Sequence, residues 1–284
     1  MSTTAKGFNT EAIGQWSEPF EFAVTSERIK QYAAATNDPI AAHASGELAP
    51  PVFAIVPAFQ IAGEAALKVI PGELLMMVLH GEQDFHFHAP ILPETTVTTR
   101  AAPIGLKPRS SGVTVIVKAD THDADGKLLV EQYMTSFVRG GQAPEAVGEQ
   151  APAHQFEESL RSKQPLTEVR QTFDSDQTFR YSEASGDPMP IHLDDALAKA
   201  MGLPGIIIHG LCTMAFTSVA VIETACPEDP ARLKRLAVRF AKTVQPEQTI
   251  TTRIWSGSTD SYAFETESDQ GAVVIKDGLA QIRS

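Results

Sequence analysis

An aspartate and a histidine in the second half of the chain are spaced like a pair that could activate water. Asp187 follows a Ser-Gly step, and His192 stands five residues later. Water is a weak nucleophile, so its addition to carbon needs a base within hydrogen-bonding distance. A carboxylate and an imidazole that hold one water could deliver its hydroxyl and its proton to the same face of a substrate. Each residue alone has a plainer interpretation, because aspartate is common in turns and histidine can open a helix.

A His-Gly step downstream could supply the donor that such a reaction also needs. His209 and Gly210 stand before an apolar segment that predicts a buried helix over 210–224. The first N–H groups of a helix have no partner within it and lie at the positive end of its dipole. The Gly210 N–H is therefore the candidate donor to an oxyanion, and glycine lets a substrate approach the backbone closely. His209 is expected to anchor the loop before the helix.

The segment around this helix has two other interpretations. Residues 201–222 contain no Asp, Glu, Lys or Arg and are long enough to cross a bilayer. Pro204, Gly205 and several hydroxyl side chains interrupt the segment, so we interpret it as a loop followed by a buried helix. Cys212 lies one turn into that helix, and its apolar surroundings predict an inert core thiol rather than a nucleophile.

The Asp–His pair is one part of an internal repeat. The same four residue types recur at an offset of 149, namely Tyr32, Asp38, Pro39 and His43 against Tyr181, Asp187, Pro188 and His192. A second match recurs at an offset of 153, namely Phe87 and residues 93–100 against Phe240 and residues 246–253. Loop insertions change such offsets slightly, so the pattern indicates gene duplication followed by fusion.

Each copy predicts the same order of elements. A short helix comes first, over 27–35 with Thr25 or Ser26 as its cap and over 176–184 with Asp174 or Ser175 as its cap. A buried apolar helix follows, over 56–69 and 210–224. Four strands complete each copy, over 82–88, 95–101, 112–119 and 127–138 and over 235–241, 249–255, 261–267 and 273–282. We expect an α+β fold in which two antiparallel sheets, each wrapped around a buried helix, pack side by side.

A segment rich in Gly, Ala, Pro, Gln and Glu separates the copies. It spans 140–152, and its composition suits a mobile linker. We therefore predict an N-terminal unit over 1–139, a linker over 140–168 and a C-terminal unit over 169–284.

The motif of the second copy resembles that of a known enzyme family. Ser185-Gly186-Asp187-Pro188-Met189-Pro190-Ile191-His192, followed by Ile208-His209-Gly210-Leu211, resembles the MaoC-like, R-specific 2-enoyl-CoA hydratase (hydratase 2) family. The first half, with His80-Gly81-Glu82-Gln83, resembles the non-catalytic half of its fused, double hot-dog members.

This resemblance implies a reaction and roles for residues. It implies a double hot-dog fold and reversible hydration of trans-2-enoyl-CoA to (3R)-hydroxyacyl-CoA, a hydro-lyase reaction of fatty-acyl metabolism that needs no cofactor and no metal. Asp187 and His192 match the catalytic pair, with Gly210 as the candidate oxyanion donor. The substrate-binding residues that we expect are Met189, Ile191, His209, Arg239 and Lys242. The N-terminal repeat is expected to be non-catalytic and to enclose the acyl chain.

One position departs from the family. Met189 stands where the family usually has asparagine, whose amide could orient water or substrate. Methionine cannot do so, which puts the rate or the substrate in doubt. A larger apolar side chain could instead accommodate a bulky acyl group.

The first copy keeps the pair but not its surroundings. It has Asp38 and His43 but lacks a His-Gly step, with Ile55 and Val56 where we expect the buried helix to begin. We interpret this half as a relic without chemistry of its own.

Charged and metal-binding residue types leave two choices open. A basic run from Arg232 to Lys242 could bind the phosphates of coenzyme A or could lie on a solvated strand edge. His86 and His88 lie on one strand face with Asp84, which could be half of a metal site but more simply indicates a solvent-facing strand.

Composition narrows the class of protein. The net charge of −12 disfavours nucleic-acid binding, which depends on neutralising phosphates. Two cysteines are too few for a disulfide framework, so we expect a reducing, cytoplasmic location. We expect no membrane partner, and a homodimer is plausible.

Three other functions share these features. A (3R)-hydroxyacyl thioester dehydratase acting on acyl carrier protein, in lipid or polyketide synthesis, would use the same residues. A thioesterase could share the fold but usually lacks the Asp–His spacing. An inactive acyl-thioester binding subunit is indicated by Met189 alone.

Overall fold

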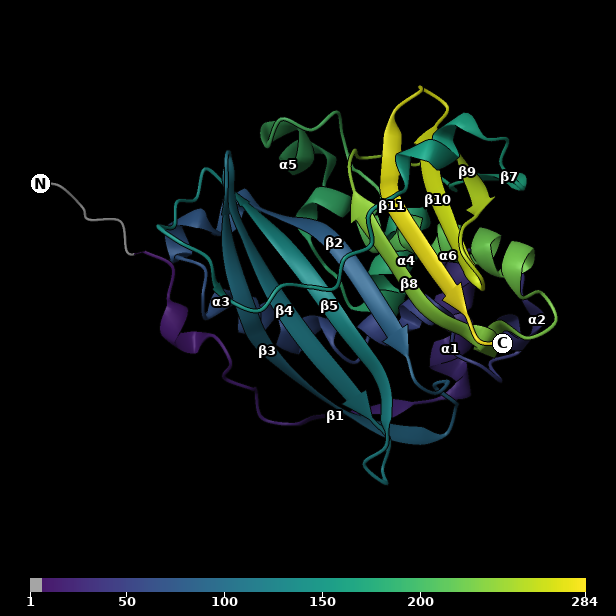
Figure 1. The fold of residues 1–284 in the computed structure, drawn as a ribbon, viewed down its shortest axis with the longest axis horizontal. Helices are drawn as coiled ribbons and strands as arrows, with labels where there is room; N and C mark the ends of the chain where they lie inside the picture. The colour runs from purple at the N-terminus through teal and green to yellow at the C-terminus, as the bar shows by residue number, and fades with distance from the viewer. Residues whose placement is uncertain (1–6) are drawn as a thin grey trace, which may run out of the picture.

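The strands form a single sheet that runs through both copies (Figure 1). The computed structural model describes residues 7–284, so the first six residues of the predicted N-terminal unit lie outside it. The eleven strands pair antiparallel throughout this part of the chain. Their order is β1 (Phe20–Val24), β3 (Thr95–Arg109), β4 (Gly112–His122), β5 (Leu128–Arg139), β2 (Val78–Phe87), β8 (Leu233–Phe240), β11 (Val273–Ile282), β10 (Ser261–Ser268), β9 (Thr249–Ser256) and β7 (Thr167–Thr172), with β6 (Val147–Gly148) beside β3.

The junction between the copies lies between β2 and β8. We expected two sheets packed side by side, but these two strands pair directly and join the sheets edge to edge. Their register aligns Glu82 with Arg239 and His86 with Arg235. The repeat offset of 153 relates Glu82 to Arg235 and His86 to Arg239, so applying it to one pair gives the other pair. The central pair, Asp84 and Ala237, maps onto itself under that offset. A local two-fold axis therefore passes through this pair.

The buried helix differs between the copies. In the second copy α6 (Gly210–Ala225) confirms the predicted start at Gly210 and lies behind strands β8 and β11 in Figure 1. In the first copy a 3-10 turn, η2 (Pro51–Ile55), precedes the shorter α3 (Phe59–Leu67). The expected start at Val56 is therefore wrong, because the segment already begins to coil at Pro51, where proline suits the first position.

The two short helices, one from each copy, pack against each other. α1 (Ser26–Ala35) begins at Thr25, whose hydroxyl accepts the Arg28 N–H as expected of a cap. α4 (Gln177–Ser185) starts without a side-chain cap, so the predicted caps at Asp174 or Ser175 are wrong. The hydroxyl groups of Tyr32 and Tyr181, one from each helix, lie 3.3 Å apart and fully buried.

The hydrophobic core also crosses the junction. One cluster of buried side chains includes residues of both copies, such as Phe53 and Phe85 from the first and Phe216 and Phe264 from the second. A second cluster lies under the sheet of the first copy alone. The predicted strands are present in both copies, and the edge strands β1 and β7 are additions that we did not predict.

The segment between the copies contacts the sheet along its length. β6 pairs with β3, η4 (Glu158–Ser162) contributes Leu160 to a small apolar cluster, and the imidazole of His154 donates to the Asp277 carbonyl at 2.8 Å. Part of the segment over 140–152 thus pairs with the sheet, and its mobility stays a prediction. Among residues 7–284, no helix combines the length and the apolar character that crossing a bilayer needs.

Candidate active site

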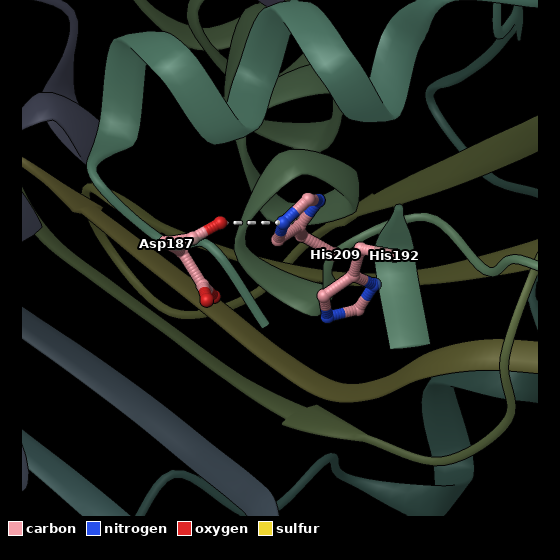
Figure 2. A group of neighbouring side chains, drawn as sticks. All are labelled: Asp187, His192 and His209. Carbon is pink, nitrogen blue, oxygen red and sulfur yellow. Dashed lines mark hydrogen bonds between the residues drawn. The ribbon is translucent and has the colours of Figure 1, made fainter. Parts of the chain in front are cut away.

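Asp187, His192 and His209 lie close together at the N-terminus of α6 (Figure 2). One ligand atom from each lies within 4.8 Å of the others. Gly186, with φ of +76°, ends α4 in a left-handed turn and so directs the chain toward Asp187. His192 closes the 3-10 turn η5 (Pro190–His192), and His209 is the last residue before α6. Local turn and cap geometry therefore brings together three residues that the sequence singled out.

The imidazole of His192 is held in one tautomer. Its Nδ1–H donates to the carbonyl of Ile207 at 2.7 Å, so Nε2 keeps its lone pair. The side chain is buried, and burial lowers the pKa of His192 below its ordinary value. A neutral imidazole with an unprotonated Nε2 is the form that accepts a proton from water.

The carboxylate of Asp187 is oriented by its own turn. Oδ1 accepts the Met189 N–H at 3.1 Å. Partial burial raises the pKa of Asp187, while the nearby His192 opposes that shift. The site therefore contains an acid with a raised pKa beside a base with a lowered pKa, a combination typical of acid–base sites.

His209 supports both members of the pair. Its ring stacks on that of His192 with 3.7 Å between centroids, and its Nε2–H donates to the Asp187 carbonyl at 3.3 Å (Figure 2). Burial lowers the pKa of His209 to about 3, so the ring is neutral. The Tyr181 ring also packs against the His209 ring, with 4.9 Å between their centroids. These contacts support the expected anchoring role.

The same three residues form a poor metal site. Imidazole nitrogens bind a metal along lone pairs that lie in the ring plane. The rings of His192 and His209 are stacked 3.7 Å apart at an interplanar angle of 24°, so the two ring planes do not meet close to both nitrogens. A tetrahedral ion needs ligands that point at one centre. The arrangement therefore suits a shared water better than an ion.

Gly210 is packed closely against an aromatic ring. A Cβ atom there would lie 3.2 Å from the ring of Phe240. His80, from the first copy, meets the same ring edge-on with 5.0 Å between centroids and bonds to Gln83 at 3.1 Å. As the first residue of α6, Gly210 has an N–H without a partner inside the helix. Our sequence reasoning gave no role to Ile207, although the loop before the His-Gly step contains it.

The expected coenzyme A contacts have different surroundings. The guanidinium of Arg239 pairs with Glu82 at 2.8 Å and with Asp277 at 3.1 Å, so two carboxylates already balance its charge. Lys242 is exposed beyond the end of β8. The alternative of a solvated strand edge is wrong, because β8 lies between β2 and β11. Phosphate binding by Arg239 and Lys242 stays a prediction.

The expected acyl contacts flank the pair. Met189 is 49% exposed, which places the departure from the family at the surface of the site. Ile191 is half-buried, and its carbonyl accepts the Ile207 N–H at 3.3 Å. Contact of either side chain with substrate stays a prediction.

The pair of the first copy has a different hydrogen-bonding pattern. Asp38 Oδ2 accepts the Nδ1–H of His43 directly, at 2.7 Å, and both residues are buried. Pro50 and Pro51 open the coiled segment in the position that His209 and Gly210 have in the second copy. Proline has no N–H, so this copy lacks the candidate oxyanion donor.

We expected the face of β2 that contains Asp84 and His86 to face solvent, and this expectation is wrong for Asp84. Asp84 is 2% exposed and is engaged by Arg235, while His86 Nε2 lies 3.1 Å from Asp84 Oδ2. Burial raises the pKa of Cys212, which agrees with an inert thiol.

Known proteins match the chain over nearly its full length. The MaoC like domain matches residues 157–277, and the MFE-2 hydratase 2 N-terminal domain matches residues 43–140. The probable enoyl-CoA hydratase 2 of Dictyostelium discoideum is 31% identical over 73% of this chain and 70% of its own. The 3-hydroxyacyl-thioester dehydratase Y of Mycobacterium tuberculosis is 29% identical over 95% of this chain and 97% of its own.

A solved structure extends the likeness to the fold. The MaoC-like dehydratase from Phytophthora capsici superposes with a TM-score of 0.86 at 24% identity, covering 97% of this chain and 99% of that one. Two repeats, each with a sheet curled around a central helix, make this the double hot-dog fold that we predicted. The chain belongs to the enoyl-CoA hydratase 2 family, with a MaoC-like domain as its second repeat.

Proposed function

We propose that the chain is a hydro-lyase that reversibly adds water to trans-2-enoyl-CoA and forms (3R)-hydroxyacyl-CoA. One observation carries this proposal. The Nδ1–H of His192 is fixed on the Ile207 carbonyl, which leaves Nε2 as an acceptor beside the Asp187 carboxylate. Two acceptors this close can hold the two hydrogens of one water.

The reaction needs that water to be split across the double bond. His192 Nε2 takes one proton as the water oxygen bonds to C3 of the enoyl thioester. The π electrons of the C2=C3 bond move to the thioester oxygen and form an enolate. The enolate collapses as C2 receives the proton from His192, so one O–H bond and the C2=C3 π bond are lost and one C–O and one C–H bond form. Asp187 keeps its charge and orients the water throughout.

The enolate oxygen needs a donor. The Gly210 N–H lies at the start of a helix of 16 residues, where the backbone dipoles favour negative charge. Removal of one such donor from other enzymes costs about 10²–10³ in rate. The close packing of Phe240 on Gly210 supports this role, because it holds the first turn of α6 in place.

The test follows loss of enoyl absorbance with crotonyl-CoA and with a long-chain trans-2-enoyl-CoA. We expect Asp187→Asn to lower kcat by about 10²–10⁴. Asp38→Asn is the matched control, because it makes the same change in the other copy of the motif. We expect the kcat of Asp38→Asn to stay within about twofold of the unmodified chain. The first copy has Pro51, which lacks an N–H, in the position of the Gly210 donor.

Product chirality completes this test. Coupling to an R-specific dehydrogenase should give a signal, and coupling to an S-specific one should give none. Activity that survives Asp187→Asn but is lost in Asp38→Asn would move the active site to the first copy.

Dehydration of a (3R)-hydroxyacyl thioester is the second candidate. It is the same step in reverse, and the dehydratase relative that matches over 97% of its own length favours it. The paired state of Arg235 and Arg239 leaves little free positive charge for an acidic carrier protein. Equal kcat/KM on coenzyme A and carrier-protein thioesters would contradict our preference for coenzyme A.

Three further features belong to this proposal. The first repeat encloses the acyl chain, as the resemblance to the fused members of the family implies. A cytoplasmic location is supported by two free, buried cysteines and is tested by cell fractionation. A homodimer is tested by sedimentation.

A further inference from the structure

A histidine of the first copy packs against the aromatic ring that contacts Gly210 in the second copy. We propose that His80 is a positioning residue for the hydration. Its ring holds the ring of Phe240, and Phe240 holds the first turn of α6, so that the Gly210 N–H is in place for the enolate oxygen. This inference rests on the proposed function, because it concerns the donor which that function assigns.

A β-bulge in β2 directs the side chain of His80. The pairing of β2 with β5 shifts its register between His80 and Glu82, so Gly81 is an extra residue in the strand. In a regular strand His80 would share the face of Glu82, on which His154 of the linker lies. The extra residue reverses this alternation and turns His80 to the other face, toward Phe240. Bulges beside active sites often re-aim a side chain in this way.

A chain of buried hydrogen bonds fixes the ring of His80. The Ala54 carbonyl can only accept, and it accepts from Gln132 Nε2 at 3.0 Å. Gln132 Oε1 then accepts from Gln83 Nε2 at 3.2 Å. This leaves Gln83 Oε1 to accept the Nε2–H of His80, at 3.1 Å. Both glutamines are at most 2% exposed, so water has little access to these bonds and the ring keeps one orientation.

The contact of His80 with Phe240 leads to the oxyanion donor. The two rings meet edge-on, with 5.0 Å between centroids and an interplanar angle of 67°, which is a favoured geometry for aromatic pairs. The Phe240 ring in turn packs on Gly210, where an added Cβ would lie 3.2 Å away. Burial lowers the pKa of His80 to about 4, although its bond to Gln83 opposes that shift. The neutral ring therefore acts through Phe240 and not as an acid or base.

The first test is His80→Gln, because a glutamine amide can keep a hydrogen bond to Gln83 while the ring is lost. We expect kcat on crotonyl-CoA to fall about 5–20-fold, less than the about 10²–10³ that outright loss of a donor costs. KM should stay within about twofold, because the donor stabilises charge that forms only in the transition state. The matched control is His86→Gln, which makes the same change on the opposite face of β2 and should keep kcat within about twofold.

A mutant cycle with Phe240→Leu distinguishes positioning from a general loss of stability. Because His80 acts through Phe240, His80→Gln should change kcat by less than about twofold in the Phe240→Leu background. An equal loss of kcat in both backgrounds would overturn the proposal. An unchanged kcat in His80→Gln, with activity abolished by Asp187→Asn, would also overturn it and leave the proposed function intact.

The amide of Gly210 gives a test that needs no turnover. Histidine precedes glycine only at Gly81 and Gly210, so ¹³C in histidine carbonyls and ¹⁵N in glycine mark these two amides. His80→Gln removes the first signal and should shift the second, because the Phe240 ring moves relative to it, whereas His86→Gln should shift neither strongly. An unshifted Gly210 amide in His80→Gln would overturn the proposal. A shifted amide in a chain without enoyl-CoA turnover would contradict the proposed function instead of the link from His80 to Gly210.

Discussion

The two Asp–His pairs share a five-residue spacing but leave different atoms free. In the second copy the Ile207 carbonyl accepts the Nδ1–H of His192, and this bond uses neither Nε2 nor the Asp187 carboxylate. In the first copy Asp38 itself takes the Nδ1–H of His43. The difference is decided by a carbonyl 15 residues away from its histidine, so spacing alone could not reveal it.

At this scale the pH profile is the first prediction. Because burial lowers the pKa of His192, its Nε2 is unprotonated at neutral pH and takes up a proton only below the ordinary value of 6.5. We expect kcat/KM to be flat above pH 6.5 and to fall as the solution becomes more acidic. Initial rates in overlapping buffers measure the profile. An acid limb centred above pH 6.5 would mean that the charge of Asp187 dominates over burial.

Substitution of Met189 is the second prediction. Its side chain is 49% exposed, and only its backbone N–H contacts Asp187. We expect Met189→Asn to leave the free energy of unfolding within about 0.5 kcal/mol, as for other surface changes. An added amide donor should raise kcat on crotonyl-CoA and lower preference for bulky acyl chains. Met189→Leu is the control. If the ratio of kcat/KM on crotonyl-CoA to kcat/KM on a bulky acyl-CoA is the same in all three proteins, Met189 does not determine specificity.

At the scale of elements, the sequence predicts what is local. Alternation of apolar residues identified the strands of both copies, and the uncharged segment over 201–222 identified α6. The pairing of β2 with β8 joins residues 157 apart, such as Glu82 and Arg239, and no local pattern encodes it. The alternative of a solvated strand edge for the basic run failed for the same reason, because β2, which covers that edge with Glu82 and Asp84, lies in the other copy.

The ion pair across this junction gives the third prediction. Asp84 accepts two hydrogen bonds from Arg235, at 3.0 and 2.8 Å, and both residues are at most 9% exposed. Asp84→Ala should lower the free energy of unfolding by about 3–5 kcal/mol, because it leaves a buried charge unpaired. Denaturant unfolding measures the loss. Glu158→Ala removes the exposed partner of Arg161 and should cost less than about 1 kcal/mol.

The same carboxylate makes this stability pH-dependent. Its partners hold the pKa of Asp84 below the ordinary value of 3.8, although burial opposes them. The stabilisation is therefore complete above that value and is lost as the pH falls through the folded-state pKa. Arg235→Met removes one of these partners and leaves His86, so it should make this acid-sensitive part smaller.

At the scale of the whole molecule, the continuous sheet and the shared core give the fourth prediction. Units that share one sheet and one core cannot lose one half without exposing the other. We expect one cooperative unfolding transition for the whole chain, with the calorimetric enthalpy equal to the van't Hoff enthalpy. Two resolved transitions would show that the repeats are separate folding units.

The axis through Asp84 and Ala237 has a consequence for which sequences this architecture permits. In an assembly of two identical chains, a residue on the axis must face its own copy, so every choice there has to be self-compatible. Two aspartates directly opposite each other would repel. In a single chain that contains both halves, the two residues on the axis can differ. Here Asp84 lies opposite Ala237, and one arginine, Arg235, balances the charge of Asp84. Joining the halves covalently thus makes available pairings that no symmetric pair of chains could encode.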